Sequence, residues 1–384
     1  MLKKIRAFLT RISHRPPRDY SKLSRTAVII YLAFIPTAIV YLIARLSPDF
    51  ADFFNRYISQ PLRILYAKLT NLLPFSFAEA LLLLLPVMLG LLLYHAIKHR
   101  TKSRRTTLIY IAELISIAGV FLIIFIWNFG VGYYTAPLDD ENKLNLDRTE
   151  VSAEELYETA LVLVENVNTE ARNMTYRYDG FSVMPYSLSE MNQRLLEAYE
   201  DFCMEYDFMD TFRSRVKPVM LSEPMSYTHI TGVYSYFTGE ANLNVVFPDY
   251  SLPYTAAHEL AHQRGIAREN EANFIAFLVC IRSDDAYLRY SGYLNLYEYV
   301  ASALYRADPE LYSDARSRLS APVQQELRAY SDFFEKYRDS TVSEVSGAIN
   351  NSYLQMQGTE GTRSYGLVVD LAVAYYKERA TVPQ

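Results

Sequence analysis

Three long apolar stretches in the first 133 residues constrain the fold of this 384-residue chain more than any other feature. The first, residues 27–44, has no charged side chain over eighteen positions and is extended by Leu46. The second covers residues 75–97 and the third residues 107–131. Because a helix needs about 20 apolar residues to cross a bilayer, the pattern predicts three transmembrane helices within residues 26–133. A cleaved signal peptide is the alternative for the first stretch, but the two similar stretches that follow favour spans.

The distribution of charge predicts how these helices are oriented. Residues 1–133 carry 17 Lys and Arg against 5 Asp and Glu, whereas the remainder carries 21 against 38. The basic side chains gather in an N-terminal arm, residues 1–25, and in a short loop, residues 98–105. Basic flanks face the cytoplasm. We therefore expect a multi-pass protein of the cell membrane, with the lipid bilayer as a partner, a cytoplasmic N-terminus and an extracytoplasmic C-terminal domain. The acidic remainder argues against nucleic acid as a partner.

Two glutamates lie within the apolar stretches, Glu79 near the start of the second and Glu113 inside the third. An acid within a membrane is a candidate functional residue by default. Because the two lie at different depths on antiparallel spans, we expect no direct pair, and we expect each to face the helix bundle or to reach toward the interface. The intervening residues 47–74 mix charged and apolar side chains, which predicts an interfacial helix or a packed loop.

The remainder of the chain reads as a polar linker, residues 134–148, followed by one extracytoplasmic domain, residues 149–384. Two capping-box patterns, Ser152 to Glu155 and Ser187 to Glu190, are expected to open helices. Alternating β-branched and aromatic side chains predict two strands. After Arg282 the pattern is helical almost to the end. We therefore expect an α+β fold that is mainly helical with a small β-sheet. The strands are expected at 230–238 and 241–247, and the late helices at about 286–305, 308–318, 321–337, 341–356 and 365–379.

The clearest candidate site is a five-residue motif, His258-Glu259-Leu260-Ala261-His262. On a helix, residues i and i+4 share one face, so His258 and His262 could present two imidazoles to one Zn²⁺ ion. Glu259 could then reach a water on the metal and act as general base. Two surface histidines on a solvated helix are the alternative. Only three of the six histidines of the chain follow Tyr134, and two of them are in this motif, which favours the metal site.

The third metal ligand is expected on the next helix, where Glu269, Glu271 and Asn273 stand. At about 100° per residue, Glu269 and Asn273 share a stripe of small side chains that could approach the motif helix closely, whereas Glu271 shares the bulkier face. The pattern therefore favours Glu269 as the ligand and keeps Glu271 as the alternative. In the favoured arrangement Glu271 would cap its helix or pair with Arg268 or Arg264.

The whole run resembles the H-E-x-A-H…E-x-E-A-N-F signature of an uncharacterised family of bacterial membrane-anchored, zincin-like proteins, a domain of unknown function. Ser364-Tyr365-Gly366 near the C-terminus is similar to that family too. The resemblance implies a zincin-like metallopeptidase domain of the gluzincin type, in which a glutamate of the following helix binds the metal. Metzincins have a glycine and then a third histidine after the motif. Gly265 fits the glycine, but Arg268 stands at the histidine position, so the metzincin pattern does not match. Arg264 also departs from the pattern, since an apolar residue usually stands there.

The resemblance also implies where a substrate would bind. In zincins an edge strand just before the motif helix binds the substrate backbone by strand addition. Ala241–Val245 is the candidate for that strand, and an ordinary core hairpin is the alternative. A donor besides the metal is needed for the oxyanion. His229 and Tyr365 are the candidates, and a structural use of each is the alternative.

Two functions follow from these expectations. The first is a membrane-anchored zinc metallopeptidase, which hydrolyses the peptide bonds of a peptide or protein substrate outside the cytoplasm through zinc-activated water and the general base Glu259. The alternative is a non-catalytic, zinc-stabilised sensor or assembly module of the cell envelope. The presence of Glu259 favours the enzyme, because zinc binding alone does not need it. A transporter is disfavoured, because more than half of the chain lies outside the membrane region.

Overall fold

The computed structural model describes residues 22–98, 103–359 and 367–381. The chain divides into two compact units, one of Met1–Ile39 with Leu84–Ile123 and the other of Val40–Leu83 with Ile124–Gln384. Most of the predicted basic arm and part of the predicted basic loop lie outside the described residues, as does the Ser364-Tyr365-Gly366 stretch.

Helices cover all three apolar stretches: α2 (Arg25–Leu46), α5 (Phe77–Lys98) and α6 (Arg104–Asn128). By length and composition, α2 and α6 could each cross a membrane. The described apolar part of α5, Phe77–Leu92, is shorter than these two. Two of the three predicted spans are therefore supported as candidate spans within the described residues, and the middle one stays a prediction.

The two glutamates of the apolar stretches accept hydrogen bonds from different parts of the chain. In the first unit, Glu113 on α6 accepts hydrogen bonds from the backbone and the hydroxyl of Ser24, the latter at 2.9 Å. In the second unit, Glu79 accepts the backbone N–H groups of Met220 and Leu221, at 2.9 and 2.7 Å. Glu79 therefore faces the folded domain and not a bundle of apolar helices, and its position relative to the membrane interface stays a prediction. Its place at the start of α5 lets it cap two amides of the folded domain instead.

The segment between the first two apolar helices is a packed helix. It consists of α3 (Pro48–Phe54), a π-helical stretch η1 (Asn55–Ser59) and α4 (Gln60–Thr70). Arg63 is fully buried and donates to the side chain of Asn55 and to the carbonyl of Asn128, at 2.9 and 2.8 Å. The hydrogen bonds of this one arginine join the segment to the residue that ends α6.

Both predicted capping boxes are confirmed, because they depend only on neighbouring residues. Ser152 caps α7 (Ala153–Ala171) and Ser187 caps α8 (Leu188–Glu205). The predicted linker, residues 134–148, begins at the end of a 3-10 turn, η2 (Gly130–Tyr134), and packs into the domain, with Leu138 fully buried.

A three-stranded mixed sheet lies beside the helices, so the prediction of a mainly helical fold with a small sheet is confirmed. Strand β3 (Glu240–Leu243) is central, with β1 (Val216–Pro218) parallel on one side and β2 (Gly232–Ser235) antiparallel on the other. The expectation that Ala241–Val245 forms the edge strand is therefore wrong. The sequence pattern did not reveal β1, which is three residues long and pairs with β3 from a distance in the chain.

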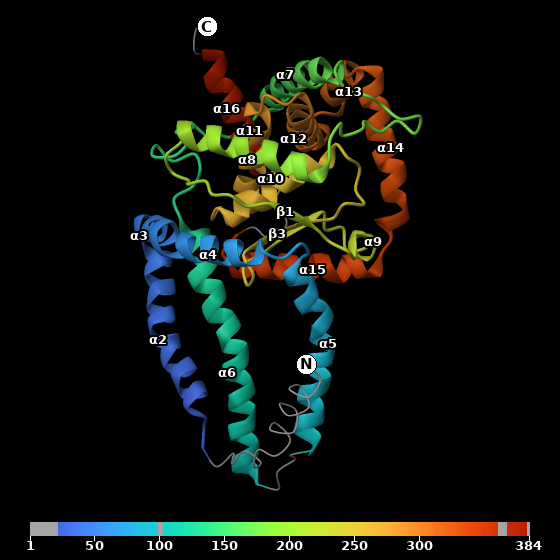
Figure 1. Cartoon of the computed structure of the whole chain (residues 1–384). Helices are drawn as coiled ribbons and strands as arrows, with labels where there is room; N and C mark the ends of the chain where they lie inside the picture. The colour runs from blue at the N-terminus through green and yellow to red at the C-terminus, as the bar shows by residue number, and fades with distance from the viewer. Residues whose placement is uncertain (1–21, 99–102, 360–366, 382–384) are drawn as a thin grey trace. The chain divides into compact units, whose positions relative to one another are not determined.

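Helices α10 (Ser251–Gln263) and α11 (Glu269–Arg282) form the centre of the second unit. Almost every residue of both is buried, and α11 packs against α8, α10, α12 and α16 (Figure 1). A helix that is apolar on all sides must be covered on all sides, which holds α11 in place against α10. The remaining helices are α9 (Ser222–Ser226), α12 (Ala286–Ala307), α13 (Pro309–Ser317), α14 (Ala321–Arg338), α15 (Thr341–Met356) and α16 (Val368–Thr381).

Candidate metal centre

The motif lies on α10, and the end of this helix brings the next one back over it. Gly265 has a φ of 104°, which is left-handed and favours glycine. Its N–H donates to His262 O at 3.0 Å, and the N–H of Ile266 donates to Ala261 O at 3.1 Å. These two bonds are a Schellman motif, which ends a helix sharply. Helix α11 consequently begins at Glu269, only six residues after α10 ends.

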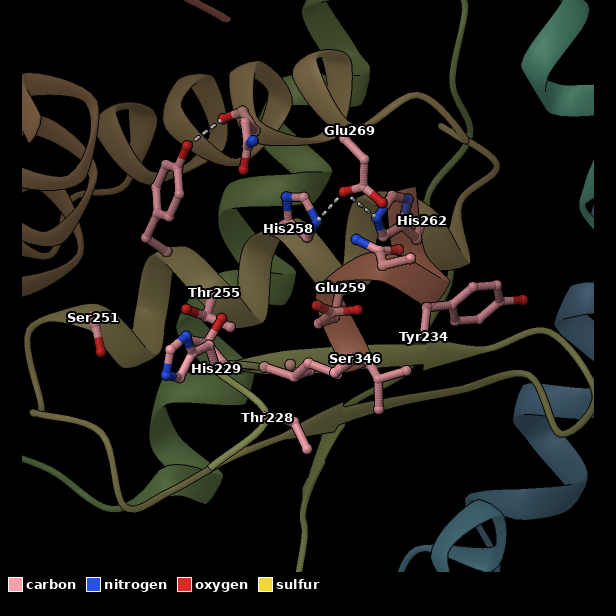
Figure 2. A pocket seen from close by; sticks show the side chains of 18 of the residues that line it. Thr228, His229, Tyr234, Ser251, Thr255, His258, Glu259, His262, Glu269 and Ser346 are labelled. Carbon is pink, nitrogen blue, oxygen red and sulfur yellow. Dashed lines mark hydrogen bonds and ion pairs between the residues drawn. The ribbon is translucent and has the colours of Figure 1, made fainter. Parts of the chain in front are cut away.

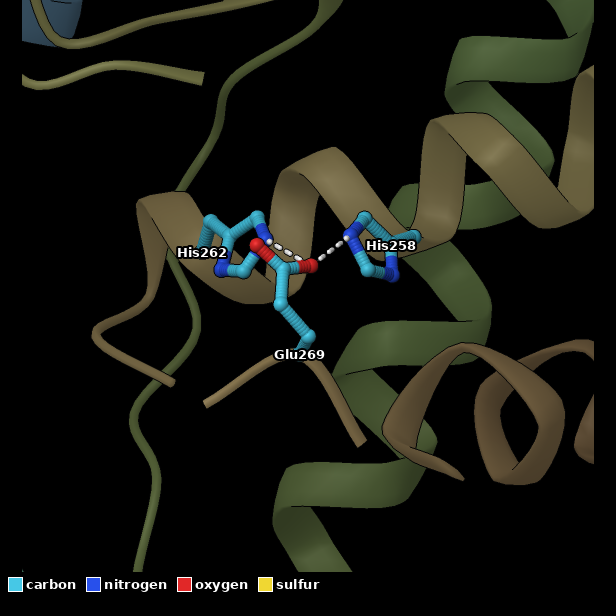
Figure 3. Close-up of side chains that lie close together, drawn as sticks. All are labelled: His258, His262 and Glu269. Carbon is cyan, nitrogen blue, oxygen red and sulfur yellow. Dashed lines mark ion pairs between the residues drawn. The ribbon is translucent and has the colours of Figure 1, made fainter. Parts of the chain in front are cut away.

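Three side chains from the two helices meet at one point, as Figure 3 shows. Oε2 of Glu269 lies 3.2 Å from Nε2 of His258 and 3.4 Å from Nε2 of His262. One ligand atom from each residue lies within 4.8 Å of the others. With zinc bonds of about 2.0–2.1 Å, two ligand atoms of a tetrahedral site stand roughly 3.3 Å apart. The two imidazoles and one carboxylate thus have the donor types of a zinc site with one open position, and the carboxylate stands at tetrahedral spacing from each imidazole.

The orientation of His262 also suits metal binding. Its Nδ1 lies 2.7 Å from the carbonyl oxygen of Ile266, so Nδ1–H donates there and Nε2 is the nitrogen that faces Glu269. The Nδ1 atom of His258 and the Nδ2 atom of Asn273 are buried and have no hydrogen-bond partner. Each of these two atoms could therefore still form a hydrogen bond beside the cluster.

The electrostatics of the cluster are those of an ion pair. Burial alone would lower the pKa of His262, but the Glu269 carboxylate outweighs burial and raises this pKa to about 9. Burial would raise the pKa of Glu269, but the two imidazoles hold it well below its ordinary value. A metal cation at this point would replace the imidazolium proton, because it needs neutral imidazoles and an ionised carboxylate as ligands.

Glu259 lies beside the cluster, between α10 and strand β2 (Figure 2). Burial raises the pKa of its carboxylate, and the two neighbouring imidazoles oppose that shift. A Cβ at Gly232 would come within 2.6 Å of Oε1 of Glu259. Only glycine therefore lets β2 approach the carboxylate this closely, and no local pattern in the sequence points to this role.

Glu271 lies outside the cluster. Its Oε1 pairs with Nη2 of Arg268 at 2.6 Å and accepts the N–H of Leu138 at 3.0 Å. Glu269 thus lies against the two histidines, whereas Glu271 hydrogen-bonds to residues 134–148 and helps to hold that segment in place. Arg264, which departs from the zincin-like pattern, is buried with its guanidinium 4.0 Å from the ring centre of Tyr199. This stacking lets a charged residue occupy a position where apolar ones are usual.

The cluster opens into a cleft of about 1200 Å³ lined by residues of β2, α10, α11, α12 and α15. At the C-terminal end of α10 the wall is aromatic, with the ring of Phe129 lying 5.8 Å from that of His262 and 5.9 Å from that of Tyr236. At the N-terminal end tyrosines and smaller polar side chains share the lining, and this end is called the polar end. It includes Ser251, Thr255, Asn295, Glu298 and Ser302.

The two candidate oxyanion donors are differently placed. His229 lines the cleft, but its Nε2 lies 2.7 Å from the carbonyl oxygen of Tyr337 and its ring packs on Phe334. Tyr365 lies outside the described residues. The structure adds Tyr299, which lines the cleft together with Glu269. Nothing in the sequence around Tyr299 distinguishes it from the many other tyrosines.

Comparison with known proteins gives one match. No curated protein and no solved structure matches the chain. A family model, described as "Protein of unknown function (DUF3810)", matches residues 50–373, which include the motif helix, the three clustered side chains and the cleft. Because the match covers most of its length, the chain belongs to this DUF3810 family.

Proposed function

We propose that this protein is a membrane-anchored, zinc-dependent hydrolase that cleaves peptide bonds outside the cytoplasm. The observation that carries the proposal is the meeting of His258, His262 and Glu269 within 4.8 Å, with Glu259 beside them in an open cleft. The three would hold the metal. Bound there, a zinc ion would supply a charge that acidifies water and polarises a carbonyl.

The side chains of the protein would do the remaining chemistry. Glu259, whose raised pKa makes it a better proton acceptor than an ordinary carboxylate, would take a proton from the attacking water and pass it to the leaving amine. The hydroxyl of Tyr299 would donate a hydrogen bond to the developing oxyanion. The edge strand β2 would pair with an extended substrate, because its residues Gly232 and Val233 line the cleft.

The bilayer enters the proposal through α6. This candidate span ends at Asn128, and the next residue, Phe129, already lines the cleft. A substrate bound in the cleft would therefore lie within a few residues of the end of a span. The three apolar helices would anchor the chain, with the second unit outside the cytoplasm. A reporter enzyme fused after residue 100 should be cytoplasmic and one fused after residue 145 extracytoplasmic, and the same side for both would refute this topology.

The full-length protein, purified in detergent, tests the chemistry. Wild type should retain about one zinc per chain and cleave bonds in a denatured-protein substrate such as casein. Glu259→Gln should keep the zinc and lose hydrolysis by roughly 10²-fold or more, and His258→Ala should lose the zinc. Zinc without hydrolysis in wild type would refute the hydrolase and leave a structural metal site, and a protein without zinc would refute the metal site as well.

A further inference from the structure

Glu298 on α12 is a cleft carboxylate that the proposed chemistry does not use. Among the described residues that line the cleft, the carboxylates are Glu259, Glu269 and Glu298, and there is no lysine or arginine. The first two belong to the metal site. Glu298 lies at the polar end of the cleft, beside Tyr250 at the start of α10.

Glu298, which is half-buried, lacks the partners that two fully buried carboxylates of this fold, Glu240 and Glu326, have. Glu240 pairs with Lys217 at 2.7 Å and accepts two backbone N–H groups. Glu326 accepts the backbone N–H and the hydroxyl of Ser182 and a third bond from a tyrosine. By contrast, Glu298 has one long hydrogen bond, from the Tyr250 hydroxyl at 3.5 Å.

The surroundings of Glu298 disfavour its charge. Burial, the largest cause, and the nearby Glu326 together raise its pKa to about 7. A glutamine could fill the same space without this cost, because an amide carries no charge to desolvate. No lysine or arginine of the cleft neutralises this carboxylate. A cation carried by a ligand would therefore stabilise its charged form.

We propose that Glu298 forms an amine subsite, so that the cleft selects peptides carrying a primary amine. The ligand group is an ammonium, whether on a lysine-like side chain or at a free amino terminus, and its N–H groups donate to the carboxylate. This inference rests on the proposed function, since it names the class of peptide that the same cleft takes. The absence of lining arginine and lysine fits this choice, because a cleft that selected a carboxylate terminus would need such a cation.

Binding to a hydrolysis-deficient protein tests the subsite without requiring turnover. The protein is full-length, zinc-loaded Glu259→Gln in detergent micelles, and the readout is calorimetric affinity. The first probe is a pool of N-acetylated heptapeptides with lysine at each position in turn. The second has norleucine in place of lysine, and the third has norleucine with a free amino terminus. The comparison of the first and third pools separates the two sources of the amine.

The lysine pool or the free-terminus pool should bind at least about 30-fold more tightly than the acetylated norleucine pool. Adding Glu298→Gln should reduce that advantage to less than about threefold. The exposed Glu310→Gln is the charge-matched control and should leave the advantage unchanged. Unchanged zinc content and a cooperative thermal transition at no lower temperature than that of the Glu259→Gln protein would show that the variants fold.

Equal affinities for all three pools, or an amine advantage that survives Glu298→Gln, would overturn the subsite. These outcomes are independent of hydrolysis. A wild-type protein that binds zinc but cleaves nothing would refute the proposed function, while the binding comparison would still decide whether Glu298 recognises an amine.

Discussion

The two ends of helix α10 stand in opposite environments within one cleft. At the C-terminal end, Phe129 packs against His262 and lies in a stacked arrangement with Tyr236 at 5.9 Å. At the N-terminal end, Tyr250 reaches Glu298 through a single long hydrogen bond. The rings of the aromatic end pack against one another as in a hydrophobic core. The carboxylate of Glu298 at the polar end has no cationic partner among the residues that line the cleft. The difference suggests that one end holds the metal cluster in place and the other recognises a ligand.

The largest expected effect concerns the aromatic end. Phe129→Ala should lower the free energy of unfolding by about 3–5 kcal/mol, because it removes a buried ring from a cluster of rings. Asn295→Ala at the polar end should cost less than about 1 kcal/mol, since its amide only bonds within its own helix. Thermal unfolding of both variants with a zinc chelator present makes the comparison. Similar losses would remove the distinction between the two ends.

The second effect concerns the metal cluster that lies between the ends. Glu269→Gln should weaken zinc binding by more than about 100-fold, because it removes the anionic donor that contacts both imidazoles. Glu271→Gln should keep zinc affinity within about threefold while lowering stability, because it breaks the pair with Arg268. Competition with a fluorescent zinc chelator measures both affinities. The reverse order would give the ligand role to Glu271.

The third effect is a dependence on pH at the polar end. The native protein holds the Glu298 proton up to about pH 7, whereas the unfolded chain loses it near the ordinary value of 4.5. The free energy of unfolding therefore falls as pH rises through this range. Glu298→Gln should be more stable than wild type by about 1–2 kcal/mol at pH 8 and equal to it at pH 4. Denaturant unfolding at the two pH values checks this, and a difference that does not vary with pH would contradict it.

The smallest effect is expected on α15, which carries exposed apolar side chains along the cleft. Val342, Val345 and Ile349 all line the cleft, and Ile349 is 66% exposed. Ile349→Ser should change the free energy of unfolding by less than about 0.5 kcal/mol, because little apolar surface is buried there. A larger loss in thermal unfolding would show that α15 belongs with the aromatic end and is packed for stability.

Local patterns in the sequence determined much of this protein. The capping boxes at Ser152 and Ser187, the helical end of the chain and the sharp end of α10 at Gly265 all depend on residues within a turn of one another. Helical periodicity also predicted that Glu269, and not Glu271, would face the histidines, and the structure brings Glu269 to them. Its role as a metal ligand stays a prediction.

Only the tertiary structure decided the rest of the cleft. Strand β1 pairs with β3 from 25 residues away and thereby makes β3 the central strand, so that β3 cannot be the edge beside the cleft. Phe129 reaches His262 from the end of α6, and Glu298 meets Tyr250 from another helix. Such contacts join residues that are distant in the chain, so helical periodicity and motif spacing do not predict them. They form because α10 and α11 are buried along almost their whole length, so that segments from elsewhere in the chain must pack around them.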